Sequence, residues 1–303
     1  MVVPPPIRAQ ALSKFYGRER GVLDLDFTVQ SGEVFAFLGP NGAGKTTTIR
    51  LILDLIRPTR GTIEVFGHDP RHDVSLRRRI GYLPGDLRLY ERLTPRDLCV
   101  YFAHLRGLRG TGRAADIASL LELSFERPIG SLSKGNRQKA GIVQAFMHDP
   151  DLLVLDEPTA GLDPLVQQVF YRLLADAQGR GATTFLSSHV LPEVQHVADR
   201  VAVVRDGRLV LVEGVDALRA RASTRLEATF ASTPPRQAFA GIETAEEIDR
   251  HGRTVLFAVN GEIDPLIKAL ARYPVTAIDS HEADLEDIFL TLYRNGQEER
   301  HAA

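Results

Sequence analysis

A glycine-rich segment between a predicted strand and a predicted helix constrains the fold of this chain more than any other feature. Val34 to Leu38 form a continuous apolar run of strand length, and apolar residues from Ile49 to Ile56 recur at helical spacing until Arg57-Pro58. Between them, residues 39–46 read GPNGAGKT, which fits the pattern GxxxxGK[ST]. A strand, a glycine loop and a helix in this order predict an α/β domain whose loop binds phosphate groups.

The residue types of this loop suit a nucleotide with Mg²⁺. Glycines let successive backbone N–H groups surround phosphates, and the following helix N-terminus adds a partial positive charge. Lys45 can neutralise phosphate oxygens, and the Thr46 hydroxyl can contact Mg²⁺. We therefore expect a nucleotide-binding set of Gly39, Pro40, Asn41, Gly42, Ala43, Gly44, Lys45, Thr46 and Thr47.

A second apolar run supplies two acids at its end. Leu152 to Leu155 read as a buried strand, and Asp156 and Glu157 follow it directly. Ligands of α/β domains bind at the carboxyl ends of parallel strands, so both acids are expected beside the phosphate loop. We assign Asp156 to Mg²⁺ and Glu157 to polarising the attacking water as general base. Together with the loop, these acids predict a nucleoside triphosphatase.

The segment from Leu132 to Gln138 narrows the family. Its letters, LSKGNRQ, resemble the LSGGQ signature of ATP-binding cassette proteins, and Gly161-Leu-Asp163-Pro164 and Ser188-His189 follow in that family's order. The resemblance implies ATP as the nucleotide and a signature that closes over the γ-phosphate held by a second subunit. It also implies a catalytic role for His189 and stacking of an aromatic residue on adenine. The positions that match are Ser133, Lys134, Gly135 and Asn136 for the signature, Asp163 for the D-loop and Tyr16 for the adenine contact.

Two departures from the family pattern affect expected contacts. Where the family has Gln after Gly-Tyr-Leu-Pro, this chain has Gly85, which carries no side chain for Mg²⁺. Asp86 follows one residue later, and it is either a substitute metal ligand or a solvated loop acid. The signature has Lys134 and Asn136 where the family has Gly and Gln, but it keeps Ser133 and Gly135.

The order of predicted elements gives the domain organisation. Residues 1–215 read as a nucleotide-binding domain of largely parallel α/β type, with a helical insertion at about residues 84–149. Asp206-Gly207 predicts a hairpin at the end of its sheet. Residues 216–303 read as a small α+β accessory domain with strands at 225–230 and 254–259, a helix at 265–273 and an acidic amphipathic stretch at 283–293.

Composition excludes several classes of protein. The chain has 303 residues with 37 Lys and Arg against 39 Asp and Glu, a formal net charge of -2, so no overall field favours nucleic acid as a partner. Because Cys99 is its one cysteine, the chain cannot form an internal disulfide. Cys99 lies in an apolar helical stretch and is expected in the core. No apolar run reaches the length of a membrane span, and the first residues do not resemble a signal peptide.

Within the cassette family, the chain resembles the ATPase subunits of ABC-2 type drug or antibiotic exporters. The resemblance rests on a single cassette, the Gly-Tyr-Leu-Pro segment and a C-terminal stretch that reads ADLEDIFL at residues 283–290. It implies two copies of the chain, bound from the cytoplasmic face of the cell membrane to a separate permease that exports drugs, antibiotics or lipids. The alternative is a cassette ATPase acting on a soluble macromolecular partner. Three other classes of protein do not match this sequence. Translation-factor proteins carry two cassettes in one chain, and repair ATPases have a long coiled coil before the signature. Small-molecule kinases have no signature.

Overall fold

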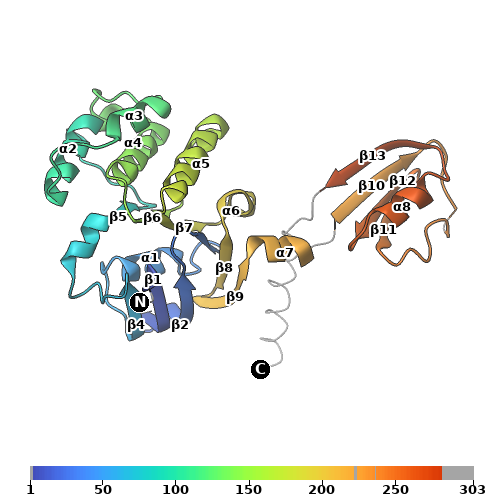
Figure 1. Ribbon diagram of the computed structural model, residues 1–303, viewed down its shortest axis with the longest axis horizontal. Coiled ribbons are helices and arrows are strands. Elements are labelled where there is room, and N and C mark those ends of the chain that lie inside the picture. Colours follow the sequence, from blue (N-terminus) through green and yellow to red (C-terminus); the bar gives the residue numbers. More distant parts are fainter. Residues whose placement is uncertain (1–2, 222–223, 236, 282–303) are drawn as a thin grey trace. The chain divides into compact units, whose positions relative to one another are not determined.

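The computed structural model describes residues 3–221, 224–235 and 237–281 (Figure 1). The chain divides into two compact units, Met1–Glu213 and Gly214–Ala303. This division lies next to the boundary expected near residue 215. The acidic stretch predicted at residues 283–293, with the segment at 283–290 that supported the exporter resemblance, lies outside the described residues.

The centre of the first unit is a six-stranded sheet. Its strand order is β5 (Ile80–Leu83), β6 (Leu152–Asp156), β7 (Thr183–Ser188), β3 (Val34–Leu38), β8 (Arg200–Arg205) and β9 (Arg208–Gly214). The first five strands pair in parallel. Asp206 and Gly207 both have positive φ, 48° and 76°, as a tight hairpin turn requires. The predicted hairpin therefore ends the sheet at β9.

The largely parallel sheet is thus confirmed, but a second, antiparallel sheet was not predicted. Its order is β2 (Glu19–Val29), β1 (Ile7–Tyr16) and β4 (Arg60–Val65). The β1–β2 register shifts between Ala9 and Leu12 and again further along, and Ala11 and Asp24 have positive φ of 44° and 50°. Such bulges interrupt the alternation of apolar and polar residues. Because sequence reasoning uses that alternation, these strands were missed.

The parallel sheet is buried on both faces, which explains its continuous apolar strands. Phe35, Phe37 and Phe185 lie on one face and pack with Phe27 of β2, with ring centroids 5.4 to 6.0 Å apart. On the other face, alternate residues such as Leu155 pack with the helices. The five apolar residues of β3 thus serve two cores, one against the antiparallel sheet and one against the helical layer.

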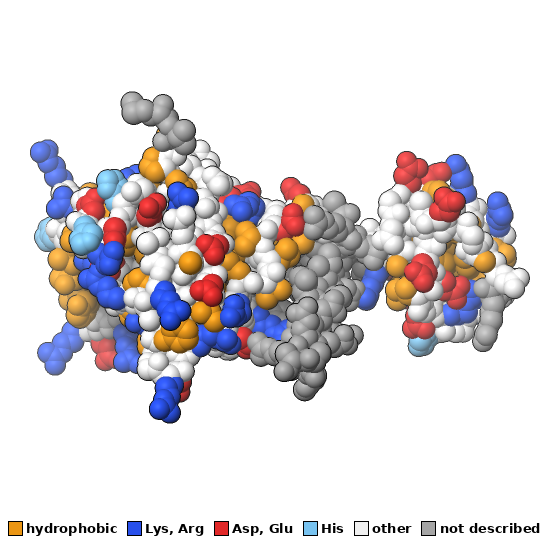
Figure 2. Space-filling model, turned by 90° about the horizontal axis from the view of Figure 1, so that it is seen from below, with side chains coloured by type: hydrophobic (Ala, Val, Ile, Leu, Met, Phe, Trp, Pro, Cys, Tyr) orange, Lys and Arg blue, Asp and Glu red, His pale blue; other side chains and the backbone are white. Residues whose placement is uncertain are grey.

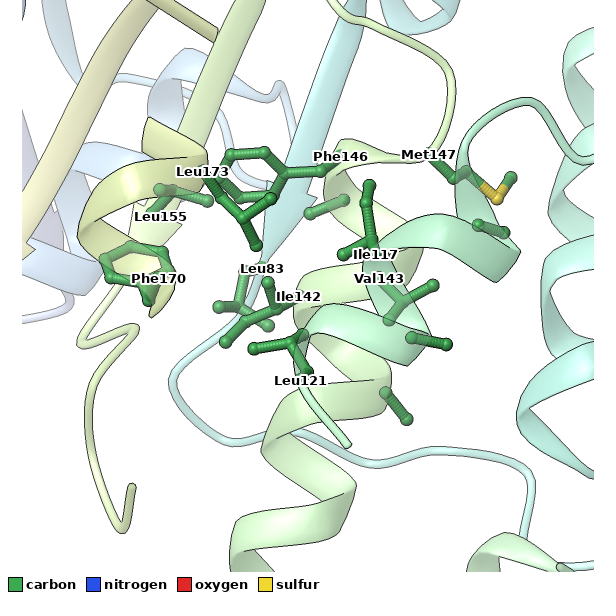
Figure 3. Close-up of a cluster of buried hydrophobic side chains, with 14 of the residues drawn as sticks. Leu83, Ile117, Leu121, Ile142, Val143, Phe146, Met147, Leu155, Phe170 and Leu173 are labelled. Atoms are coloured by element: carbon green, nitrogen blue, oxygen red, sulfur yellow. The ribbon is translucent and has the colours of Figure 1, made fainter. Parts of the chain in front are cut away.

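The helical insertion predicted for residues 84–149 forms a layer of helices that packs on β5 and β6. It contains α2 (Pro95–Arg106), α3 (Ala114–Leu120) and α4 (Lys134–Phe146), and α5 (Pro164–Gly179) packs beside them (Figure 1). Figure 3 shows Ile142, Phe146 and Leu121 converging with Phe170 and Leu83 in one cluster. Cys99 is buried in this same core, as expected. The α2 helix begins at a capping box formed by Thr94 and Asp97 and ends at Gly107.

Helix α1 (Lys45–Ile52) is shorter than predicted. The helical spacing extends to Ile56, but Asp54 adopts a positive φ of 55° and the N–H groups of Leu55 and Ile56 donate to the Arg50 carbonyl. Asp54 also forms an ion pair with Arg57. The chain therefore leaves the helix at Leu53, while its later apolar residues still pack on the core.

The second unit is a four-stranded antiparallel sheet with one helix packed on it. Its strand order is β11 (Ala245–His251), β12 (Thr254–Val259), β10 (Thr224–Phe230) and β13 (Val275–His281), with α8 (Asp264–Leu270) and, at the unit's start, α7 (Val215–Arg221). The two predicted strands are the central ones. The two missed strands are the edges, where β11 has no buried residue and the pattern of alternating burial is lost.

The surface of the molecule mixes charges of both signs. Figure 2 shows Lys and Arg side chains interspersed with Asp, Glu and apolar side chains on the face in view. Within the described ranges, the helices are too short or too polar for any of them to cross a membrane. Helix α6 (Leu191–Val197) lies between β7 and β8 in the chain, and β7 borders the site described next.

Candidate active site

The cleft that contains most of the predicted residues lies at the carboxyl ends of β3, β6 and β7. The parallel register places Leu38 beside Ser188 and Asp156 beside Ser187, so the three strands end at one edge. The cleft there has a volume of about 880 Å³. Its lining includes the predicted residues Tyr16, Pro40, Asn41, Gly42, Ala43, Gly44, Lys45, Thr46, Thr47, Asp86, Asp156, Glu157 and His189.

The glycine loop forms one wall of this cleft, and its shape depends on glycine at two positions. A Cβ at Gly39 would lie 2.3 Å from the Val204 carbonyl oxygen. Gly44 has φ of 104° as N-cap of α1, and a Cβ there would lie 2.6 Å from Val22 Cγ1. Lys45 is buried, and its Nζ donates to the Gly39 carbonyl at 2.7 Å. The loop thus holds the Lys45 ammonium group against its own backbone carbonyls.

Asp156 is placed where a metal bound to phosphate would need oxygen ligands. Its carboxylate is buried, and Oδ2 accepts from the Thr46 hydroxyl at 2.8 Å. The Ser187 hydroxyl donates to the other carboxylate oxygen. One carboxylate with one hydroxyl, the rest being supplied by phosphates and water, is the donor set that Mg²⁺ uses in phosphate-transferring sites. These two residues therefore fit Mg²⁺.

Glu157 lies at the centre of the cleft and contacts two of the predicted residues. Its Oε1 is 3.2 Å from Lys45 Nζ, and its Oε2 is 2.7 Å from His189 Nδ1. The backbone of Glu157 has a positive φ of 49°, a conformation that costs a non-glycine residue on the order of 1 kcal/mol. This turn directs the residue after β6 into the cleft instead of continuing the strand.

Comparison with known proteins decides the family. The ABC transporter family model matches residues 22–160. The bacitracin transport ATP-binding protein BcrA of Bacillus licheniformis is 34% identical to this chain, over 96% of this chain and 98% of its own. The chain belongs to the ABC transporter family.

Two further comparisons agree. The Nod factor export ATP-binding protein I of Burkholderia orbicola (strain AU 1054) is 32% identical over 95% of this chain and 96% of its own. A solved ATP-binding subunit of an ABC transporter is 32% identical with a TM-score of 0.65, over 70% of this chain and 91% of its own. The cassette fold and the resemblance to exporter subunits are confirmed, and the chain is a nucleotide-binding, ATP-hydrolysing subunit of an ABC transporter.

Tyr16, the residue predicted to contact adenine, lines the cleft. Tyr16 ends β1 and is 44% exposed, and Lys14 Nζ lies 5.4 Å from its ring centroid. Arg20 lines the cleft across the same hairpin, because Phe15 pairs with Arg20 in the register. Sequence reasoning missed Arg20, since the bulged hairpin that brings it beside Tyr16 was not predicted.

Sequence reasoning missed further lining residues, and for two of them local spacing contained a signal. Arg50 lies one helical turn after Thr46 in α1, and Tyr82 lies three residues before Gly85. Burial, together with the nearby Asp156 carboxylate, raises the pKa of Tyr82 to about 12. Tyr82 therefore keeps its proton at neutral pH, and its side chain stays neutral beside the Asp156 carboxylate.

Gly85, rather than Asp86, lies next to the Asp156 carboxylate. A Cβ at Gly85 would lie 3.2 Å from both Cγ and Oδ2 of Asp156. The Asp86 side chain is 75% exposed, and its Oδ2 accepts from Arg88 Nε at 3.0 Å. In the part of the chain that the structure describes, no three His, Cys, Asp or Glu residues gather as a metal site. Asp86 thus lines the cleft while its carboxylate pairs with arginine.

The signature and the D-loop do not line the cleft of their own chain. Ser133 is the N-cap of α4, and its Oγ accepts from the Asn136 N–H at 3.2 Å. A Cβ at Gly135 would lie 2.9 Å from the Gly161 carbonyl oxygen, and the Lys134 stem also lies against Gly161. The signature and the D-loop therefore abut each other. Asp163 caps α5 by accepting from the Val166 N–H at 3.0 Å.

Gln138 links the signature helix to the cleft. It is buried, and its Nε2 donates to the Pro158 carbonyl at 2.9 Å. Pro158 follows Glu157 directly, so a side chain of α4 holds the segment that carries the central acid. The sequence places Gln138 in the signature, but its contact with a residue 20 positions away depends on the fold.

Proposed function

We propose that two copies of this chain hydrolyse ATP with Mg²⁺ at shared sites and drive a separate membrane permease that exports a drug, an antibiotic or a lipid. One observation carries the proposal. The cleft contains the phosphate loop and both acids, but Ser133, Gly135 and Asp163 lie outside it. A complete anion site over the γ-phosphate then requires these residues from a second copy.

The chemistry follows from the contacts in the cleft. The phosphate loop and Lys45 bind the phosphates, with Lys45 exchanging its Glu157 contact for phosphate oxygens. Glu157 accepts the proton of the attacking water, and His189, 2.7 Å from it, orients that carboxylate and contacts the γ-phosphate. Thr46 and Asp156 would hold Mg²⁺, which would supply positive charge to stabilise the charge that develops on the phosphates. Tyr16 stacks on the adenine.

Mixing two damaged variants tests the shared sites. Lys45→Ala disables the phosphate loop and Ser133→Arg blocks the signature, so each homodimer should be inactive. A mixed dimer has one intact composite site and one doubly damaged site. ATP hydrolysis should recover in part on mixing, and a mixture of Lys45→Ala with itself provides the baseline. No recovery in demonstrated mixed dimers would contradict two independently working shared sites.

A groove beside the cleft is proposed as the surface that receives the permease. It has a volume of about 340 Å³ and is lined largely by apolar side chains from α1, the segment after β5, and α2, among them Leu53, Leu87, Leu89 and Phe102. Leu55, Tyr82 and Pro84 line both the groove and the ATP cleft. Because the two share a wall, a helix seated in the groove can respond to the nucleotide. This contact would place the chain at the cytoplasmic face of the membrane.

Membrane binding tests this surface with matched variants. Leu87→Asp puts a charge into the groove, whereas Leu105→Asp puts the same charge on an exposed position of α2 that does not line it. In cells that contain the native permease, the first variant should shift from the membrane fraction to the supernatant and the second should not. Equal sedimentation of both variants with the membranes would contradict the groove as the docking surface.

The transported compound is proposed from the relatives alone. One relative is a bacitracin transport protein and another is a Nod factor export protein. We expect cells that lack this chain to tolerate less of an antibiotic such as bacitracin, with tolerance restored by the wild type and not by Glu157→Gln. Equal tolerance of all these strains across an antibiotic panel would contradict an antibiotic substrate.

A further inference from the structure

A buried acid next to the cleft has no part in the chemistry described so far. Glu193 lies in the first turn of α6 and is 4% exposed. Its Oε1 accepts from the Thr159 hydroxyl at 2.9 Å, and its Oε2 accepts from the Ser188 hydroxyl at 2.6 Å. Both oxygens of one carboxylate are therefore held by hydroxyls from two different segments.

These two segments also carry Glu157 and His189, whose side chains are in contact in the cleft. Thr159 follows Glu157 by two residues, and Ser188 directly precedes His189. The Ser188 hydroxyl also accepts from the Val190 N–H at 3.0 Å, so it fixes the backbone on both sides of His189. Glu193 thus joins the loop after β6 to the last residue of β7, and these two segments carry Glu157 and His189, whose side chains are 2.7 Å apart.

Burying this carboxylate costs free energy, and packing alone gives no reason for an acid at this position. Burial raises the pKa of Glu193, which its two hydroxyl donors oppose. No Lys, Arg or His nitrogen among the described residues forms an ion pair with it. A buried acid without a cation persists where its hydrogen bonds secure a particular arrangement, and functional sites are where such arrangements occur.

We propose that Glu193 is a positioning residue for ATP hydrolysis, which sets the distance between Glu157 and His189 by fixing Thr159 and Ser188 to one carboxylate. This inference rests on the roles proposed above for Glu157 and His189. It assigns to α6 the task of keeping the loops after two neighbouring strands in register while nucleotide enters and leaves.

Two variants test the proposal in the full chain. In Glu193→Gln the amide has one oxygen, so only one of the two hydroxyls keeps its acceptor. Thr159→Val removes one donor at almost constant volume. Each should lower kcat by about 10-fold to 100-fold, since a misplacement of about 1 Å in a reacting group costs about 100-fold. The KM for ATP should change little in both variants. Thr159→Val leaves one oxygen of a buried carboxylate without its donor and should lower the thermal unfolding temperature, so the deciding readout is the selective fall in kcat.

The control is Glu33→Gln. Glu33 is also a buried acid of the first unit, but it pairs with Arg200 and does not line the cleft. This variant should keep the wild-type kcat. If Glu193→Gln lowers the unfolding temperature and raises KM without a selective fall in kcat, Glu193 is structural and the proposal is overturned.

A double variant separates this inference from the role of Glu157. If Glu193 acts through Glu157, adding Glu193→Gln to Glu157→Gln should slow hydrolysis no further. An additional fall by the full single-variant factor would overturn the positioning role. A wild-type rate in Glu157→Gln alone would instead refute the general base. A slow Glu157→Gln beside a normal Glu193→Gln would refute only the inference about Glu193.

Discussion

Replacing Glu157 by Gln is the most informative single change in the cleft. The amide keeps the size of the carboxylate but has no negative charge to accept a proton from water. Loss of a general base costs about 100-fold to 10,000-fold in rate, which corresponds to about 2.7 to 5.4 kcal/mol of barrier. The contact with Lys45 Nζ at 3.2 Å becomes weaker, so Lys45 is freer to bind phosphate. We therefore expect kcat to fall while ATP affinity stays the same or rises.

The assay combines steady-state phosphate release with equilibrium binding of a fluorescent ATP analogue. Size-exclusion chromatography in ATP and Mg²⁺ should show the variant retained as a dimer, because the bound nucleotide is not consumed. Asp151→Asn is the matched control. Asp151 directly precedes β6, at the end of the strand opposite to Asp156, and it pairs with Arg79. A folded Glu157→Gln protein that hydrolyses ATP within about threefold of the wild type would refute the assignment of the general base.

Five further outcomes follow from the structure. Lys45→Ala should abolish measurable ATP binding in a titration, whereas His189→Ala should bind ATP and hydrolyse it slowly; normal hydrolysis would remove His189 from the mechanism. Asp86→Ala should leave the Mg²⁺ dependence of hydrolysis unchanged because Arg88 occupies its carboxylate, and a raised Mg²⁺ requirement would show that Asp86 is a ligand. Phe185→Ala should lower the free energy of unfolding by about 3 to 5 kcal/mol in urea titrations, because the ring is fully buried among three other phenylalanines, and an unchanged free energy would contradict that packing. Burial raises the pKa of Cys99 to about 12, so at pH 8 the neutral thiol should react with iodoacetamide only after unfolding, and fast labelling of the native protein would contradict that burial.

Sequence reasoning succeeded where a structure depends on near neighbours. The phosphate loop, the strand ending at Asp156 and the helix capped at Ser133 each arise from residues within about ten positions, so their patterns are visible in one line of sequence. It failed for β1, β2 and β4, which form the antiparallel sheet, and for β11 and β13. In the antiparallel sheet, register shifts interrupt the alternation, and β11 and β13 are edge strands that bury little apolar surface.

The sequence by itself therefore revealed the phosphate loop, the strand that ends in two acids and the signature segment, and it predicted their roles toward phosphate, metal, water and a second copy. Only the tertiary structure decided which groups touch. It brought Glu193 between Thr159 and Ser188, joined Gln138 to Pro158, and placed Gly85 rather than Asp86 beside Asp156. The reason is physical, because these contacts link residues that are distant in the chain and become neighbours only when parallel strands end at one edge and helices pack behind them.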